Sequence, residues 1–127
     1  MRIIVLDTNI ILDVLKFKVD LFEELKRICD FEYEIKILDK TLKELENKPN
    51  AKLAFRFIKE KNIKLINSEK GYVDELLLNL PKSYIIATND KALKNKVKSQ
   101  NKALITLRQK KYLILENVLW SRIKKPR

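Results

Sequence analysis

The sequence predicts an α/β protein, a three-layer α/β/α sandwich built around a central, mainly parallel, twisted sheet of about five strands. Short runs of apolar, mostly β-branched residues, such as residues 3–6, are typical of strands buried on both faces of a parallel sheet. These runs alternate along the chain with segments of helical periodicity, which is the order that produces parallel strand–helix–strand units. With 127 residues, 46% of them hydrophobic and 35% charged, the chain is expected to form one globular domain.

The predicted elements follow one another without a linker or an internal repeat. The first strand, residues 3–6, ends at Asp7 and passes directly into a short helix. A second helix spans residues 19–29, and Asp20 with Glu23 forms its capping box. The later strands are expected at residues 34–38, 63–66, 84–87 and 103–107, with residues 112–115 as the candidate for a sixth. The later helices are expected at residues 39–46, 51–60, 72–80 and 88–100.

One of these helices, at residues 72–80, is strongly amphipathic and ends at Pro81. We expect its apolar stripe to be buried against the sheet, and the stripe comprises Tyr72, Val73, Leu76, Leu77 and Leu80. The domain is predicted to span residues 1–115. Residues 116–127 are predicted to form a basic C-terminal tail.

The chain has no histidine and a single cysteine, and these absences exclude several classes of site. A Ser-His-Asp triad, a Cys-His pair and an ordinary zinc site are all excluded. Chemistry near neutral pH would therefore depend on carboxylates and on hard, oxygen-seeking cations. Cys29 lies on an apolar helical face, so we interpret it as a core residue in a protein of the reducing cytoplasm. No segment is apolar for the roughly 20 residues of a membrane span, so no membrane partner is expected.

Charge is distributed unevenly along the sequence. Residues 1–90 hold 16 basic and 16 acidic residues, whereas residues 91–127 hold 12 basic residues and one acid, Glu116, and so carry the whole net charge of +11. This segregation favours a polyanionic partner, nucleic acid before membrane. The alternative is a lysine-rich face that only keeps the protein soluble.

Four acids are predicted to meet at one edge of the sheet. Asp7 and Asp90 come directly after the first and fourth strands, while Glu44 and Asp74 lie on the helices that follow the second and third strands. In a parallel sheet all four would lie at the carboxyl edge, where ligands bind in such folds. Four carboxylates at one edge repel one another unless a divalent cation neutralises them, and Mg²⁺ or Mn²⁺ suits such oxygen ligands.

Each of these acids also has a purely structural interpretation. Asp7 could cap the helix that follows it, helped by Thr8 and Asn9. Glu44 could complete a capping box with Thr41. Asp74 and Asp90 could simply favour the positive ends of their helices. The coincidence of all four at corresponding positions is what favours a shared site.

The chain resembles the PIN-domain nucleases in segments that occur in the family's order over nearly the whole sequence. The segments are residues 5–10 (Val-Leu-Asp-Thr-Asn-Ile), 41–46, 72–77 and 86–93 (Ile-Ala-Thr-Asn-Asp-Lys-Ala-Leu). Together with residues 105–111 they are most similar to the branch that includes ribosomal-RNA-processing nucleases. The resemblance implies endonuclease activity on RNA, with a catalytic, metal-binding quartet and two supporting polar residues: Asp7, Glu44, Asp74 and Asp90, with Asn9 and Thr88. The adjacent Glu75 leaves open which acid of that pair points inward.

Two other folds begin with a similar strand and acid. Phosphatases of the haloacid-dehalogenase type need a second aspartate two residues later, where this chain has Asn9. Response-regulator receivers need an acceptor aspartate at the end of the third strand, where this chain has residues 67–69, Asn-Ser-Glu. Both interpretations fail at a residue that is essential to them.

The resulting hypothesis is a metal-dependent endoribonuclease that hydrolyses single-stranded RNA in ribosomal RNA processing or RNA quality control. Its RNA-binding residues would be Lys91, Lys94, Arg108, Lys110 and Lys111, together with Lys96, Lys98 and Lys102. Tyr112 or Trp120 could stack on a base, although burial is favoured for both. The alternatives are the toxin ribonuclease of a toxin–antitoxin pair and a catalytically silent RNA-binding subunit. The partners to consider are RNA, an antitoxin, a ribosome-assembly factor and a second copy in a homodimer.

Overall fold

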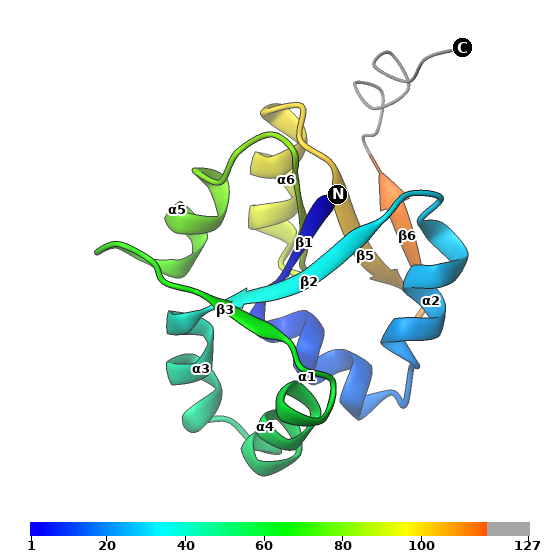
Figure 1. Ribbon diagram of the computed structural model, residues 1–127, viewed down its shortest axis with the longest axis vertical. Helices are drawn as coiled ribbons and strands as arrows, with labels where there is room; N and C mark the ends of the chain where they lie inside the picture. The colour runs from blue at the N-terminus through cyan, green and yellow to red at the C-terminus, as the bar shows by residue number, and fades with distance from the viewer. Residues whose placement is uncertain (117–127) are drawn as a thin grey trace.

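A computed structural model describes residues 1–116 and shows an α/β protein with a six-stranded, mostly parallel sheet (Figure 1). The strand order is β3-β2-β1-β4-β5-β6. The strands are β1 (Arg2–Leu6), β2 (Tyr33–Leu38), β3 (Lys64–Ile66), β4 (Tyr84–Ala87), β5 (Leu104–Arg108) and β6 (Tyr112–Glu116). Neighbouring strands pair in parallel from β3 through β5, and β6 pairs antiparallel with β5. The predicted fold class is confirmed, and the candidate sixth strand is present.

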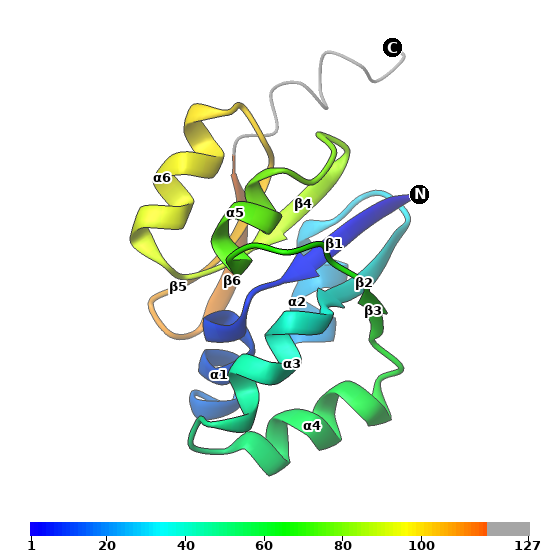
Figure 2. The same ribbon diagram turned by 90° about the vertical axis from the view of Figure 1, so that its left-hand side faces the viewer.

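Helices cover both faces of this sheet (Figures 1 and 2). They are α1 (Thr8–Lys16), α2 (Leu21–Ile28), α3 (Asp39–Glu46), α4 (Ala51–Glu60), α5 (Val73–Leu78) and α6 (Lys91–Ser99). Successive residues of β1 point to opposite faces, so Ile4 and Leu6 pack with α1, α2 and α4 while Val5 packs with α5 and α6. Each face therefore has its own apolar cluster, and β1 is buried between them as its apolar run predicts.

The amphipathic helix before Pro81 is shorter than predicted, and one residue of its apolar stripe was assigned wrongly. The helix α5 begins at Val73, so Tyr72 is its N-terminal flanking residue in an extended conformation, with φ −79° and ψ 150°. Helical periodicity does not apply to a residue outside the helix. The Tyr72 side chain is consequently 80% exposed, not buried.

Other predicted features can be located in the same way. Cys29 is half-buried against the apolar cluster of α1, α2 and α4, and burial raises the pKa of its thiol to about 11, in keeping with a core residue. Glu116 ends β6, and the remainder of the predicted tail, including Trp120, lies outside the described residues. Within residues 1–116 no helix is long and apolar enough to cross a membrane.

Lys102 was assigned to the RNA-binding surface, and the structure contradicts this. The residue is only 7% exposed, and its Nζ donates hydrogen bonds to the carbonyl oxygens of Leu78 and, at 2.9 Å, Leu80. Burial lowers the pKa of the Lys102 amine. The carbonyls at the end of a helix have no partners within the helix, and the ammonium group satisfies them here.

Replacing Lys102 by Met is therefore expected to reduce stability. The substitution keeps an unbranched apolar chain but leaves the two carbonyl oxygens without their donor, which costs about 1–3 kcal/mol of unfolding free energy. Urea denaturation followed by circular dichroism measures the loss.

The exposed Lys52 of α4 provides the matched control, since Lys52→Met should change the unfolding free energy by less than about 0.5 kcal/mol. Equal stabilities of the two variants would show that the hydrogen bonds of Lys102 do not support the fold.

Candidate active site

The candidate site lies at the carboxyl edge of the sheet, where β1 and β4 end side by side. The two strands pair as far as Leu6 and Ala87, and the amide of Asp7 donates to the carbonyl of Ala87 at 2.8 Å. Asp7 and Thr88 are thus the first residues beyond the paired strands. Figure 2 shows α1, α3, α5 and α6 beginning around this edge.

Asp7 is held rigidly in a buried position. The residue is only 5% exposed. Its Oδ1 caps α1 by accepting a hydrogen bond from the backbone amide of Thr8 at 2.8 Å. Its Oδ2 accepts a hydrogen bond from the hydroxyl of Thr88 at 2.7 Å. The helix-cap interpretation is therefore correct for Asp7. The helix cap uses only Oδ1 of Asp7. Oδ2 is oriented by Thr88, which directly follows the neighbouring strand β4.

The three other acids reach this edge from three further helices. Glu44 of α3 accepts a hydrogen bond from the hydroxyl of Thr8. Asp90 caps α6 by accepting from the amide of Leu93 at 2.9 Å. Asp74 lies in the first turn of α5 and is exposed.

The electrostatics of the site show that these carboxylates act on one another. Burial is the main cause that raises the pKa of Asp7, and the charges of Asp74 and Glu44 raise it further. Burial likewise raises the pKa of Asp74, followed by the charges of Asp90 and Glu44. Within residues 1–116 none of the four acids forms an ion pair with a lysine or arginine. Lys96 is the cation whose charge moderates the pKa of Asp74.

This set of donors fits a hard divalent cation. In the part of the chain that the structure describes, no three acidic or cysteine side chains are arranged to hold a metal ion by themselves. Mg²⁺ does not need such a cage, because it keeps several water ligands and takes only one or two carboxylates directly. Carboxylates that repel one another and lack a cationic side-chain partner are the groups that such an ion would neutralise.

Thr88 and Asn9 connect the acidic residues through hydrogen bonds. The Thr88 hydroxyl accepts a hydrogen bond from the amide of Asp90 at 3.1 Å while it donates to Asp7, so it connects the acids of β1 and α6. Asn9 Oδ1 accepts from the amide of Asn89 at 2.9 Å and lies 3.2 Å from the Thr88 hydroxyl.

Asn89 is a structural link that the sequence analysis missed. Its Nδ2 donates to Oδ2 of Asp13 on α1 at 2.8 Å, and its Oδ1 accepts from the amide of Leu107 on β5 at 2.9 Å. It therefore ties the turn that carries Thr88 and Asp90 to two other elements. The position of Asn89 between those residues was the only sequence signal, and it does not reveal where the side chain points.

The structure separates Asp74 from its neighbour Glu75. The charge of Asp74 is one of the smaller contributions that raise the pKa of Asp7, after burial, whereas Glu75 does not contribute. Glu75 turns back toward the preceding loop, because a Cβ added to Gly71 would lie 3.8 Å from Oε2 of Glu75. Asp74 is thus the member of the pair that faces the other acids.

The predicted RNA-binding residues divide into two groups. Lys91 and Lys94 lie in the first turn of α6, and Lys110 and Lys111 lie in the turn after β5, so all four are near the carboxyl edge of the sheet. The Lys110 amine also lies 5.1 Å from the centre of the Phe17 ring.

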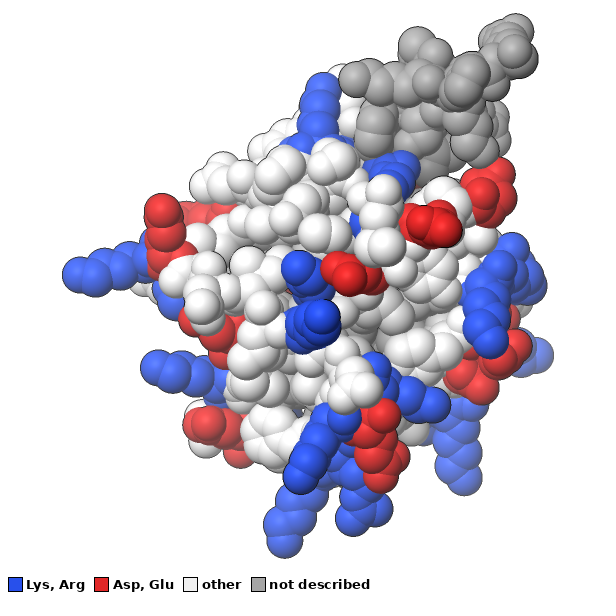
Figure 3. Space-filling model, viewed as in Figure 1, with Lys and Arg blue, Asp and Glu red and all other residues white. Residues whose placement is uncertain are grey.

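The guanidinium of Arg108 instead lies 3.6 Å from Glu116, which also pairs with Lys98 at 3.5 Å. Figure 3 shows basic side chains of the described residues spread over the visible face with acidic ones between them, so these residues do not form one compact basic patch on this face.

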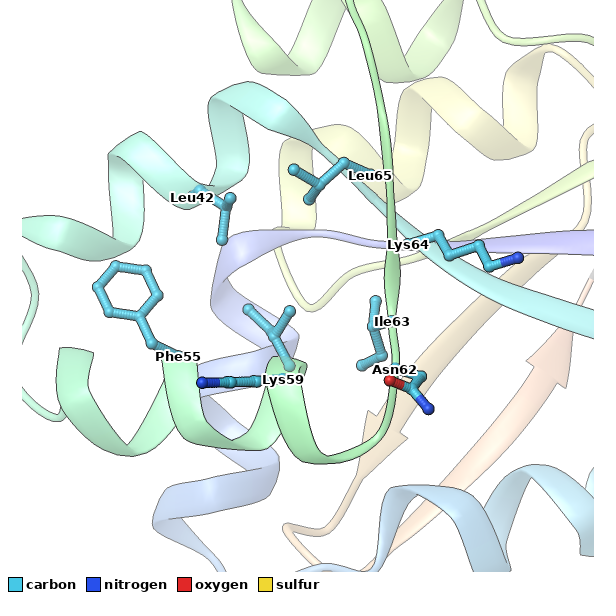
Figure 4. A pocket seen from close by; sticks show the side chains of 8 residues that line it. Leu42, Phe55, Lys59, Asn62, Ile63, Lys64 and Leu65 are labelled. Atoms are coloured by element: carbon cyan, nitrogen blue, oxygen red, sulfur yellow. The ribbon is translucent and has the colours of Figure 1, made fainter.

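A separate hollow of about 520 Å³ lies beside β3, α3 and α4 (Figure 4). It is lined mainly by apolar side chains, including Leu42, Phe55 and Leu65, with lysines at its margin. No carboxylate lines it, so it does not contribute to the acidic site.

The raised pKa of Asp7 predicts how the metal-free protein responds to pH. A carboxyl group whose pKa is higher in the folded state binds more protons when folded, so stability falls as the pH rises from the ordinary value of 3.8 through the raised one. Asp7→Asn removes the charge, and the Thr88 hydroxyl can accept from the new amide while it donates to Asn9. In chelator at pH 7 this variant should melt roughly 2–5 °C above the wild type, and the difference should shrink toward pH 4.

The control for this experiment is Asp20→Asn. Asp20 is the exposed N-terminal cap of α2, and its side chain accepts a hydrogen bond from the backbone amide of Glu23 at 3.2 Å. Its melting temperature should stay near the wild-type value at every pH, because asparagine caps a helix as well as aspartate does. A lower melting temperature of Asp7→Asn at both pH 7 and pH 4 would mean that the charge of Asp7 stabilises the metal-free fold.

Comparison with known proteins agrees with this geometry. The family model described as "PIN like domain" matches residues 4–110. The chain is 39% identical over 121 residues to "Ribonuclease VapC4" of Methanocaldococcus jannaschii, covering 86% of this chain and 92% of that protein. It is also similar to the solved structure of the PIN domain endonuclease Utp24, with a TM-score of 0.78, 25% identity and 91% of each chain covered. The chain belongs to the PIN-like domain family.

Proposed function

We propose that the chain is a metal-dependent endoribonuclease that hydrolyses phosphodiester bonds in single-stranded RNA. The observation that carries this proposal is the mutual influence of acids near the carboxyl edge of the sheet, where Glu44 and Asp74 act on Asp7, Asp90 acts on Asp74, and none of the four has an ion-pair partner in residues 1–116. Asp7, Glu44, Asp74 and Asp90 would hold Mg²⁺ or Mn²⁺. The similarity to a ribonuclease and to an endonuclease of the same family supports both the reaction and the RNA substrate.

The chain's own residues would supply the positioning in this reaction. A divalent cation held by these acids would supply a water of lowered pKa and would neutralise charge on the phosphate, so the reaction would need no histidine base. Asp7 stays oriented through its two hydrogen bonds to Thr8 and Thr88. The Thr8 hydroxyl holds Glu44 in the same site. Rigid ligands of this kind keep the reacting groups in place and so reduce the reorganisation that the reaction requires.

For the biological role we favour the toxin of a toxin–antitoxin pair over ribosomal RNA processing. The VapC4 ribonuclease is similar over 92% of its length at 39% identity, whereas the endonuclease Utp24 is similar at 25% identity. The partners would then be RNA and a small antitoxin protein that blocks the acidic site in the cytoplasm. A gene for such a protein directly upstream would support this role. Its absence would favour RNA processing.

The proposed reaction requires that Asp74, but not Glu75, be essential. The purified chain should cleave end-labelled single-stranded RNA with Mn²⁺ and lose this activity in excess chelator. Asp74→Ala should lower the cleavage rate roughly 100-fold or more, because it removes a carboxylate that acts directly on the ion and phosphate. Glu75→Ala should retain most of the rate.

Gel analysis of the cleavage products measures all three proteins under the same conditions. Unchanged cleavage in chelator would refute the metal-dependent reaction. Loss of activity in Glu75→Ala together with full activity in Asp74→Ala would assign the site to Glu75 instead.

The lysines of the β5–β6 turn should contribute to RNA binding through phosphate contacts. Each contact with a single strand adds roughly 0.7 to the slope of log affinity against log salt concentration, so Lys110→Gln with Lys111→Gln should lower the slope by up to about 1.4. Fluorescence anisotropy of labelled RNA between low and moderate salt measures it. Saturating RNA should restore most of the turnover, since the four carboxylates are unchanged.

The matched control is the double substitution of Lys52 and Lys59 by Gln, because both lysines are exposed on α4. This variant has the same net charge as the first one and should keep the wild-type slope. Equal slopes for the two double variants would mean that the β5–β6 turn does not touch RNA.

A further inference from the structure

Tyr72 is the one aromatic residue in the exposed class among the described residues 1–116. Its side chain is 80% exposed. Isolated apolar residues on a surface need no explanation. Tyr72 differs from the exposed Leu53 of α4 in its position, because it lies two residues before Asp74.

The loop that presents Tyr72 is fastened to the helix that carries Glu44. The Lys40 amine, at the start of α3, donates to the carbonyls of Glu69 and Gly71 at 2.6 and 2.9 Å. The neighbouring Asp39 Oδ1 accepts from the amide of Ser68 at 3.2 Å and from the same residue's hydroxyl. Both ends of this loop are therefore bound to one helix.

The backbone conformation of the loop directs the chain at Tyr72. Gly71 has φ +141°, a conformation that residues with a side chain rarely adopt, and Tyr72 follows in an extended conformation. The Leu76 amide donates to the Tyr72 carbonyl at 3.0 Å, which fixes the backbone of Tyr72 at the start of α5. The ring thus projects from an anchored backbone, and little conformational entropy would be lost when a ligand covers it.

We propose that Tyr72 is a positioning residue that stacks on an unpaired base of the RNA substrate, beside the acidic site. This inference rests on the proposed endoribonuclease function. Single-stranded nucleic acid exposes the faces of its bases, and an aromatic side chain beside a backbone-binding site is how proteins hold such strands without reading sequence. The ring would set the position of the strand, while the acids and lysines interact with its backbone.

The test is RNA binding measured by fluorescence anisotropy in chelator, so that metal-dependent cleavage does not occur. The probe is a labelled 12-nucleotide oligouridine, compared with an oligonucleotide of the same length that lacks all of its bases. Tyr72→Ala should weaken binding of the intact oligonucleotide roughly 10-fold. Tyr72→Phe, which keeps the ring, and the control Leu53→Ala should stay within about 2-fold of the wild type.

Two further results separate stacking from a general disturbance of the surface. Removing the bases should weaken wild-type binding at least as much as Tyr72→Ala does, and it should weaken the binding of Tyr72→Ala clearly less. The salt slope of Tyr72→Ala should equal that of the wild type, because no phosphate contact is removed. Melting temperatures verify that all variants are folded.

The inference is overturned if Tyr72→Ala binds RNA as Leu53→Ala does, or if removing the bases weakens the wild type and Tyr72→Ala equally. Either result would leave the Tyr72 ring free for a protein partner such as an antitoxin. These outcomes are independent of the cleavage test. RNA that is bound through Tyr72 but never cleaved would refute the proposed reaction alone, and metal-dependent cleavage without an effect of Tyr72 would refute the stacking alone.

Discussion

Electrostatic repulsion among carboxylates at one edge of the sheet is the constraint on which the site depends. The charges of Glu44 and Asp74 act on Asp7, and those of Asp90 and Glu44 act on Asp74, while within residues 1–116 no lysine or arginine forms an ion pair with any of the four. Burial is the main cause that raises the pKa values of Asp7 and Asp74, and the neighbouring negative charges raise them further, so keeping these acids ionised together is unfavourable in the absence of a cation. The packing of the sheet and its helices has to compensate for this local cost, and such a cost is typical of functional sites.

The parallel sheet makes that compensation possible. Ile4, Val5 and Leu6 are completely buried between two apolar clusters, so the position of Asp7 is fixed by packing on both faces of β1. Hydrogen bonds then extend this rigidity to the neighbouring elements. Thr88 connects Asp7 with the backbone of Asp90, and Asn89 connects the same turn with α1 and β5.

Much of this organisation could be predicted from the sequence, because it depends on local patterns. Apolar runs that alternate with helical segments predicted the parallel sheet. Acidic residues just after the strands predicted the candidate site. Lys102 could not be predicted, since its burial depends on carbonyls of Leu78 and Leu80 that lack partners at the end of α5. The exposure of Tyr72 depended on a helix that starts one residue later than its periodicity suggested. Both features are decided by contacts or boundaries that neighbouring residues do not specify.

The place of β1 in the middle of the sheet has a consequence for how the protein folds during synthesis. Asp7 is made before its partner Thr88, which is 81 positions further along the chain, and β1 pairs with β4 across a similar separation. Contacts of such long range form slowly and only after the intervening chain is available. A nascent chain that ends before β4 has Asp7, Glu44 and Asp74 but neither Thr88 nor Asp90. The acidic edge is therefore assembled late, and incomplete chains cannot build it.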